Sequence, residues 1–327
     1  MLYYAFGRIF FAVHHIKTVT MHTAYITHPA CLKHEMSSWH PESPARLKAI
    51  DDRLHAAHLF DYLVHRHAPK VGREELILVH DPAYVDAIFA NAPKEGLAHL
   101  DGDTAMNPHT LEAALHAAGG AVHAVDLVMV GEVESAFVAC RPPGHHATRN
   151  QAMGFCIFNN VALAAAHALA RHDVHRVAIV DFDVHHGNGT EDIFRDDSRV
   201  MLCSTFQHPF YPFCCADTSN EHIINIPLPG GTTGKQYRAV FEEQVLPRLE
   251  AFKPELILIS AGFDSHLEDD MGQFGLVEAD YVWITEQLMA VAAKYGRRRI
   301  VSVLEGGYEL SPLGRSVAAH IKTLADL

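Results

Sequence analysis

The sequence predicts an α/β fold with a single domain, in which helices flank a central and mainly parallel β-sheet. Short apolar runs alternate along the chain with longer segments of helical periodicity. Each short run is apolar on both faces, as expected for strands buried between two layers of helices. No low-complexity linker or repeat divides the 327 residues, and one α/β domain commonly reaches this length.

The predicted elements follow in order along the chain. A strand-like stretch begins at Ala24. Further strands are expected at residues 136–139, 177–180, 200–203, 256–260 and 300–304, and helices at residues 111–130, 159–171, 237–251 and 280–295. This alternation is typical of a parallel sheet built from strand–helix–strand units.

The first 20 residues form an N-terminal extension to the predicted domain, which spans residues 21–327. The extension is apolar, but Arg8 and the pair His14-His15 interrupt it, and it lacks a basic start and a cleavage signature. It is too short and too polar to predict a membrane span. Met21 is an equally good candidate for the natural start.

Composition narrows the function classes. The net charge of −13 argues against non-specific binding of nucleic acid, which requires a basic surface. The six cysteines form no C-x-x-C pair and lie in apolar runs, which predicts buried free thiols and a cytoplasmic, reducing compartment. Most of the 26 histidines are isolated, so only clusters carry weight.

Polar clusters follow four of the predicted strands. Because the carboxyl ends of parallel strands meet at one edge of a sheet, where ligands bind, we expect these clusters to converge. They are Arg141-Pro-Pro-Gly-His-His-Ala147, Asp181-Phe-Asp-Val-His-His-Gly-Asn-Gly189, Ala261-Gly-Phe-Asp-Ser-His266 and Glu305-Gly-Gly-Tyr308.

The second and third clusters predict a metal site on Asp183, His185 and Asp264. Residues two apart on an extended segment face the same side, so Asp181, Asp183 and His185 project together. Two carboxylates and one imidazole suit Zn²⁺ or Fe²⁺, and three protein ligands leave a position for water, as in catalytic sites. The alternative is that these acids only cap loops and helices.

The other two clusters supply groups that handle protons. His145 and His146 could reach a metal-bound water, with Asp181 or Asn188 orienting them. The Tyr308 hydroxyl, after two glycines, could donate to an oxyanion. The alternatives are a rigid Pro-Gly turn with incidental histidines and a tyrosine that only packs.

These motifs resemble the histone deacetylase superfamily, in particular its class II branch and bacterial relatives, from about Thr23 to the C-terminus. The resemblance implies the arginase–deacetylase fold for residues 21–327. Besides the four clusters, the matching segments are His40-Pro-Glu-Ser-Pro-Ala-Arg-Leu47, His80-Asp-Pro-Ala-Tyr84, Ala117-Ala-Gly-Gly120 and Gly154-Phe-Cys-Ile-Phe-Asn-Asn160.

The resemblance also implies roles for single residues. Zn²⁺ binds Asp183, His185 and Asp264, His146 is the general base beside Asn188, and Tyr308 polarises the acyl carbonyl. The resemblance further implies a structural K⁺ held by Asp181, Asp183, Ser204 and backbone oxygens of His185 and Thr205. It implies an acyl-lysine tunnel lined by Gly154, Phe155 and Tyr211, with a rim aspartate at Asp103. It also implies an inner product channel at Arg46.

The expected substrate is an acylated lysine or a related acylated amine. Polyamine-preferring relatives carry Glu at the gate where this chain has Met271, which weakens an acetylpolyamine reading, although Glu268, Asp269 and Asp270 lie nearby. A non-catalytic acyl-lysine-binding module and an arginase-like hydrolase with two metals remain alternatives. No feature of the sequence indicates the oligomeric state.

Overall fold

The computed structural model describes residues 23–327, so the expectations for residues 1–20 and Met21 lie outside the described part of the chain. A single eight-stranded sheet forms its centre, in the order β2-β1-β5-β10-β9-β6-β7-β8. Every neighbouring pair of strands is parallel. The strands are β1 (Thr23–Thr27), β2 (Val64–His67), β5 (Ser135–Val138), β6 (Val177–Asp181), β7 (Val200–Gln207), β8 (Ile223–Leu228), β9 (Leu256–Ala261) and β10 (Ile300–Leu304).

The predicted α/β class and all five predicted interior strands are confirmed. The central strands are buried along their whole length, which explains their apolar, β-branched sequences. The edge strand β2 escaped prediction because its Val-His-Arg-His sequence alternates between half-buried and exposed positions. β8 escaped because Asn225 and Pro227 interrupt its apolar run.

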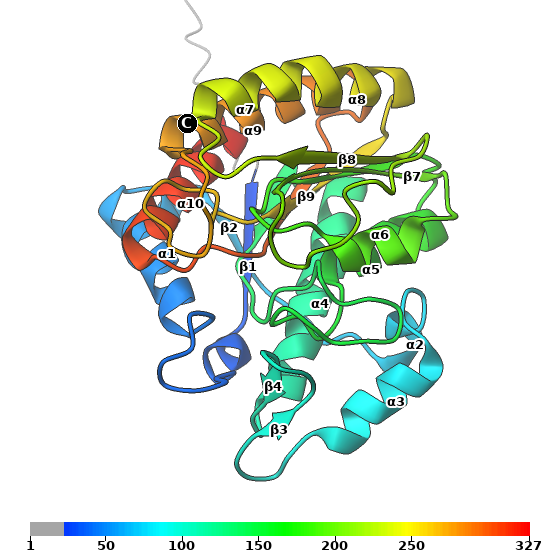
Figure 1. The fold of residues 1–327 in the computed structure, drawn as a ribbon, viewed down its shortest axis with the longest axis vertical. Helices are drawn as coiled ribbons and strands as arrows, with labels where there is room; N and C mark the ends of the chain where they lie inside the picture. The colour runs from blue at the N-terminus through cyan, green and yellow to red at the C-terminus, as the bar shows by residue number, and fades with distance from the viewer. Residues whose placement is uncertain (1–22) are drawn as a thin grey trace, which may run out of the picture.

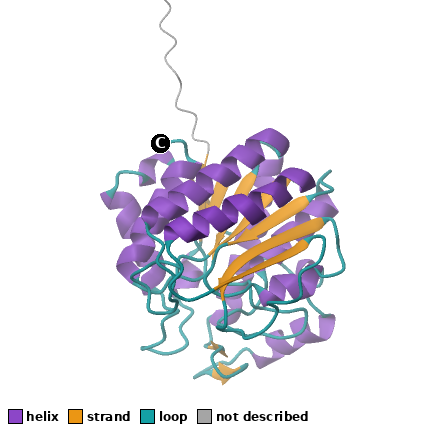
Figure 2. Ribbon diagram, turned by 45° about the horizontal axis from the view of Figure 1, so that its top comes forward, coloured by secondary structure: helices purple, strands orange, loops and turns teal. Residues whose placement is uncertain are grey.

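Helices cover both faces of the sheet, as Figure 1 shows, and Figure 2 shows the strands enclosed between the helical layers. Helices α9 and α10 pack against each other on one face, and α4 and α5 pack against each other on the opposite face. The helices are α1 (Ala45–Ala56), α2 (Arg73–Leu76), α3 (Pro82–Asn91), α4 (Thr110–Met129), α5 (Asn160–Arg171), α6 (Asn188–Phe194), α7 (Gly234–Val240), α8 (Leu246–Phe252), α9 (Glu278–Tyr295) and α10 (Leu310–Leu324).

The helix predicted over residues 237–251 is interrupted in the structure. α7 passes into a π-helical segment, Phe241–Val245, before α8 begins at Leu246. Pro247 lies in the first turn of α8 and has no N–H to donate to the preceding turn. The wider π-helical turn accommodates the missing hydrogen bond. The spacing of apolar residues could not predict this turn.

The prediction of six buried free thiols is wrong for two residues. Cys31, Cys140, Cys156 and Cys203 are buried and free. Cys214 and Cys215 instead lie in the loop between β7 and β8, where Cys214 is exposed and the two are joined by a disulfide. No helix within residues 23–327 is both long and apolar enough to cross a membrane.

Candidate active site

The four polar clusters converge at the carboxyl edge of the sheet, because the strands that carry them are neighbours. β5, β10, β9 and β6 are consecutive in the sheet, and each is followed by one cluster. β7 lies next to β6 and places Ser204 opposite Asp181 in the strand register. The topology therefore brings together residues that are more than 160 positions apart in the sequence.

Asp183, His185 and Asp264 form a compact, buried trio. The His185 Nδ1 atom lies 3.0 Å from Asp183 Oδ1 and 3.2 Å from Asp264 Oδ2. One ligand atom from each residue lies within 4.8 Å of the others, which is the spacing a metal ion requires. Burial and the neighbouring Asp183 carboxylate raise the pKa of Asp264 to about 7, so the trio favours a cation in its centre.

Two further features fit a metal ion in this trio. Asp264 Oδ2 is buried and makes no hydrogen bond, although His185 Nδ1 is close to it. Glycines surround the carboxylates: a Cβ on Gly262 would lie 2.0 Å from Asp183 Oδ2, and one on Gly306 would lie 2.0 Å from Asp264 Oδ2. The backbone approaches the ligands so closely that only glycine fits at either position.

Asp181, Ser204 and Thr205 lie beside the trio, on the neighbouring strands β6 and β7. The Ser204 hydroxyl is buried and has no hydrogen-bond partner. Asp181 Oδ1 accepts from the backbone N–H of Asp183 at 3.1 Å, and the Thr205 hydroxyl donates to the Asp181 carbonyl at 3.3 Å. An unpaired hydroxyl buried beside a carboxylate is a set of oxygens that suits a cation.

His145 and His146 have partners of different charge. His145 Nδ1 lies 2.9 Å from Asp181 Oδ2, and the negative charges of Asp181 and Asp183 outweigh burial and raise the pKa of His145 to about 10. His146 Nδ1 lies 2.8 Å from the neutral Asn188 Oδ1. Burial and the charge of His145 hold the pKa of His146 well below its usual value.

Tyr308 is held in place by contacts to its backbone and to its ring. The buried Asp269 carboxylate accepts hydrogen bonds from the Tyr308 and Glu309 backbone nitrogens, at 2.6 and 3.0 Å. The Arg46 guanidinium lies 4.9 Å from the Tyr308 ring centroid, and its Nε donates to the Gly307 carbonyl at 2.6 Å. Burial raises the pKa of Tyr308 far above its ordinary value, so its hydroxyl keeps its proton. Arg46 therefore lies behind Tyr308, and its side chain is fully buried.

A cavity of about 240 Å³ opens directly onto this cluster. Gly154 has a positive φ of 56°, and a Cβ there would lie 2.4 Å from the His146 ring. Asp103 accepts a hydrogen bond from the Gly154 backbone at 3.1 Å. The residues that line the cavity are Asp103, His146, Gly154, Phe155, His185, Phe210, Tyr211, Asp270, Met271 and Tyr308.

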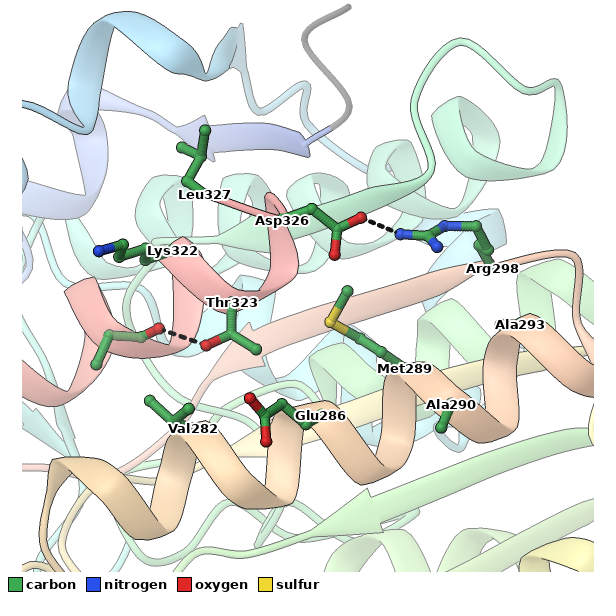
Figure 3. Close-up of a pocket in the computed structure, with 11 residues that line it drawn as sticks. Val282, Glu286, Met289, Ala290, Ala293, Arg298, Lys322, Thr323, Asp326 and Leu327 are labelled. Atoms are coloured by element: carbon green, nitrogen blue, oxygen red, sulfur yellow. Dashed lines mark hydrogen bonds and ion pairs between the residues drawn. The ribbon is translucent and has the colours of Figure 1, made fainter.

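A larger groove lies elsewhere on the molecule, between α9 and α10. Figure 3 shows Glu286 and Met289 projecting from α9 toward Lys322 and Thr323 of α10, and Arg298 paired with Asp326 at its end. Neither histidine nor cysteine is among its lining residues, and the strand-end clusters contribute nothing to it. Its titratable groups are Glu286, Lys322 and the ion-paired Arg298 and Asp326, and they lie apart from the strand-end clusters.

Two residues of the site, Glu305 and Phe210, received no role from the sequence. Glu305 is fully buried and accepts hydrogen bonds from the Gly144 and His145 backbone nitrogens, at 2.7 and 3.1 Å, so it fixes the histidine loop to β10. Phe210 stacks on the His185 ring with centroids 5.5 Å apart. Asp270, which the sequence analysis named as an acid near the gate, lines the cavity. Glu305 lies within a quoted motif, but nothing in the sequence signalled its contacts.

Three comparisons show what the chain resembles. It is 41% identical over 300 residues to an uncharacterized protein of Synechocystis sp., covering 90% of this chain and 96% of that one. It is 38% identical over 298 residues to a probable deacetylase of Archaeoglobus fulgidus, covering 89% and 82%. It is also 38% identical over 300 residues to the human polyamine deacetylase HDAC10, covering 86% of this chain and 44% of the human protein.

The fold agrees with these similarities. The crystal structure of the HDA15 HD domain superposes with a TM-score of 0.88 at 36% identity, covering 94% of this chain and 90% of that one. The family model of the histone deacetylase domain matches residues 40–324, a span that holds all four strand-end clusters. The chain therefore belongs to the histone deacetylase family.

Proposed function

We propose that this chain is a zinc-dependent amidohydrolase that removes acetyl or other acyl groups from lysine side chains or related acylated amines. The observation that carries the proposal is that His185, His146 and Tyr308 line one cavity, with Asp183 and Asp264 directly behind His185. Metal ligand, proton acceptor and hydroxyl donor are thus within reach of a single bound amide.

A Zn²⁺ ion on Asp183, His185 and Asp264, or an Fe²⁺ ion in its place, would polarise the acyl carbonyl and lower the pKa of an attacking water. His146 accepts the proton of that water. Asn188 Oδ1 is an acceptor, so the His146 Nδ1 atom carries hydrogen and its Nε2 lone pair is free. The low pKa of His146 keeps this nitrogen unprotonated at neutral pH.

His145 and Tyr308 stabilise the negative charge that develops as the water attacks the carbonyl. Tyr308 keeps its proton and donates its hydroxyl hydrogen bond to the carbonyl oxygen as that oxygen becomes negative. The Asp181 carboxylate holds His145 in its protonated form, which stabilises negative charge at the reaction centre. The proton taken up by His146 then passes to the leaving amine.

We further propose a structural K⁺ below the zinc site, held by Asp181, Ser204 and backbone oxygens of His185 and Thr205, with Asp183 beside it. The buried, unpaired Ser204 hydroxyl supports this assignment. A cation there offsets the buried negative charge of Asp181 and so keeps its orientation toward His145.

The cavity wall supports a substrate with a slender apolar arm. The Phe155 and Tyr308 rings pack edge to face with centroids 5.8 Å apart, and the Tyr211 ring stands at 90° to the His146 ring, 5.1 Å away. An aliphatic side chain such as that of lysine gains apolar contacts between such rings. Asp103 is placed at the cavity to accept from an amide N–H of the substrate, although it already bonds Gly154.

One observation favours acetylated polyamines as a second candidate substrate. Of the three acids in the segment Glu268-Asp269-Asp270, Glu268 pairs with Arg315 at 2.6 Å and Asp269 is buried beneath Tyr308. Asp270 is exposed, lines the cavity and makes no hydrogen bond or ion pair with residues 23–327. It supplies the free negative charge that Met271 lacks. The relative HDAC10 is named a polyamine deacetylase.

A substrate panel tests both candidates. The kcat/KM values of acetyl-lysine peptides are compared with those of acetylated polyamines in the Zn²⁺-loaded enzyme. If the cationic substrates are preferred, Asp270→Asn should lower their kcat/KM about three- to fivefold and leave neutral substrates unchanged. Glu268→Gln is the matched control, because its charge is already paired.

The same panel separates catalysis from simple binding. A non-catalytic acyl-lysine-binding module would bind these ligands and turn none over. An arginase-like site would bind two metal ions per chain. Full turnover by Asp183→Ala, or binding of two divalent metal ions per chain in the unmodified protein, would contradict the proposed mechanism, which has one divalent ion besides the K⁺.

A further inference from the structure

We propose that Cys214 and Cys215 form a redox-modification site that controls the substrate-binding wall of the cavity. The inference rests on the proposed function for its effect on catalysis, although the modification itself does not. The two adjacent cysteines are joined by a disulfide in the loop between β7 and β8. Cys214 is exposed, and the neighbouring Phe213 side chain is 75% exposed, so small thiols and disulfides can reach the pair.

The pair lies close along the chain to the cavity wall. Phe210 and Tyr211 both line the cavity and precede Cys214 by only four and three residues. The Phe213 backbone N–H donates to the Phe210 carbonyl at 2.8 Å, so the cysteine end of the loop is tied to the aromatic end. A change of conformation at the pair therefore has a short path to the rings that contact His185 and His146.

The other side of the pair is anchored to a buried polar network. The Cys215 carbonyl accepts from Asn225 Nδ2 at 2.8 Å and from the Thr218 hydroxyl at 2.9 Å. Both of these groups also reach the buried Glu191 carboxylate, at 2.7 and 2.6 Å. Because Glu191 belongs to α6, the helix that begins at Asn188, the far end of the loop is fixed to rigid structure.

The disulfide thus lies between two parts of the loop: Cys215, which is anchored by its hydrogen bonds, and Tyr211, which forms part of the cavity wall. Closing the ring restricts the backbone between Cys214 and Cys215, and opening it restores their freedom. The metal ligands and His145 and His146 lie on other loops, and their contacts do not involve the pair. We therefore expect the redox state to change substrate binding more than the chemical step.

The modification is an ordinary thiol–disulfide exchange. Two molecules of a small thiol such as glutathione reduce the bond: the Cys214–Cys215 disulfide gains two hydrogens and becomes two thiols, and the two glutathione molecules lose them and form one disulfide. The reverse reaction uses oxidised glutathione and closes the bond again. No metal or cofactor takes part.

Thiol titration in denaturant tests the modification without any activity measurement. After equilibration with oxidised glutathione, removal of the reagent and a check for mixed disulfides by mass, four thiols should be titrated, since four cysteines are free. After reduction, all six should be titrated. The double variant Cys214→Ser/Cys215→Ser should give four in both conditions. Six thiols in both treatments of the unmodified protein would overturn the proposal.

Steady-state kinetics on an acetyl-lysine peptide test the coupling. Reduction should raise KM at least threefold and change kcat less than twofold, with zinc content measured in both forms to exclude loss of metal. Cys214→Ser and the double variant should show the KM of the reduced enzyme and no response to glutathione. Cys31→Ala, at a buried free thiol that does not line the cavity, should keep the full response.

Equal KM values in forms that differ in thiol count would overturn the coupling. If no acyl substrate is turned over, the proposed function fails. Thiol titration then still tests the redox site, and hydrogen exchange tests its coupling to the cavity wall. Amides of residues 210–215 should exchange faster after reduction in the unmodified protein and equally fast in both conditions in the double variant. Unchanged exchange on reduction would again contradict the coupling.

Discussion

Asn188 Oδ1 lies 2.8 Å from His146 Nδ1, whereas the adjacent His145 has its Nδ1 on the Asp181 carboxylate. The two histidines share nearly the same burial but have partners of different charge. The charges of Asp181 and Asp183 outweigh burial and raise the pKa of His145, whereas burial and the charge of His145 lower the pKa of His146, whose own partner carries no charge. This difference supports the proposed roles, in which His146 accepts a proton and His145 holds a positive charge.

Asn188→Asp should shift the pH dependence of catalysis. The new carboxylate favours the protonated form of His146 and raises its pKa. The base must be unprotonated to act, so activity is lost as pH falls through that pKa, and the acid limb of the kcat/KM profile should move to higher pH. The profile from pH 5 to pH 9 measures this shift. An unmoved acid limb in a fully metal-loaded variant would assign the base to another residue.

Tyr308→Phe should lower kcat about 100- to 1000-fold, the usual loss when one oxyanion donor is removed. The ring and its contacts with Phe155 and Arg46 remain, so KM and zinc content should change little. Steady-state kinetics with metal analysis check this. Retention of most of the activity would mean that the carbonyl oxygen is stabilised by the metal and backbone alone.

Gly306→Ala should reduce zinc binding without removing any ligand. The added Cβ would lie 2.0 Å from Asp264 Oδ2 and 2.6 Å from Asp183 Oδ2, so at least one carboxylate must move. Zinc content after dialysis against a weak chelator measures the loss. Gly102→Ala is the matched control, since its Cβ meets no atom within 4 Å. A full zinc complement in Gly306→Ala would show that the ligands tolerate displacement.

Much of the candidate site could be predicted from the sequence because several of its residues lie close together along the chain. Asp181, Asp183 and His185 alternate along one extended segment, and strand ends in a parallel sheet must share an edge, so convergence followed from pattern alone. The partners of Glu305 could not be predicted in this way. Its hydrogen bonds to Gly144 and His145 join segments 160 residues apart, and no periodicity encodes such a contact.

The same limit applies to charge and to cysteine. Glu268, Asp269 and Asp270 are indistinguishable as sequence, but only packing makes the first an ion-pair partner, the second a buried anchor and the third free. Cys214 and Cys215 appeared apolar because of the aromatic residues before them, yet Phe210 and Tyr211 line the cavity, whereas Cys214 lies at the surface.

His320 should make the protein less stable in mild acid. It is fully buried between α9 and β10, its Nδ1 lies 2.6 Å from the Thr285 hydroxyl and its Nε2 lies 2.9 Å from the Ser302 hydroxyl. The Thr285 hydroxyl donates to the Tyr281 carbonyl, so it accepts from Nδ1, and in the neutral ring Nε2 accepts from the Ser302 hydroxyl. Burial lowers the pKa of His320 to about 3.

The direction of the pH effect on stability follows from how many protons the folded and unfolded states bind at His320. Between about pH 6.5 and pH 3 the unfolded chain binds a proton at this position and the folded protein does not, so the free energy of unfolding falls as pH is lowered and is unaffected above pH 6.5. At pH 5 the loss from this residue is about 2 kcal/mol. Urea unfolding at pH 7 and pH 5 should therefore show a smaller decrease for His320→Gln than for the unmodified protein, by about that amount. Equal decreases in the two proteins would mean that His320 takes up a proton in the folded state and that its burial is relieved by local opening.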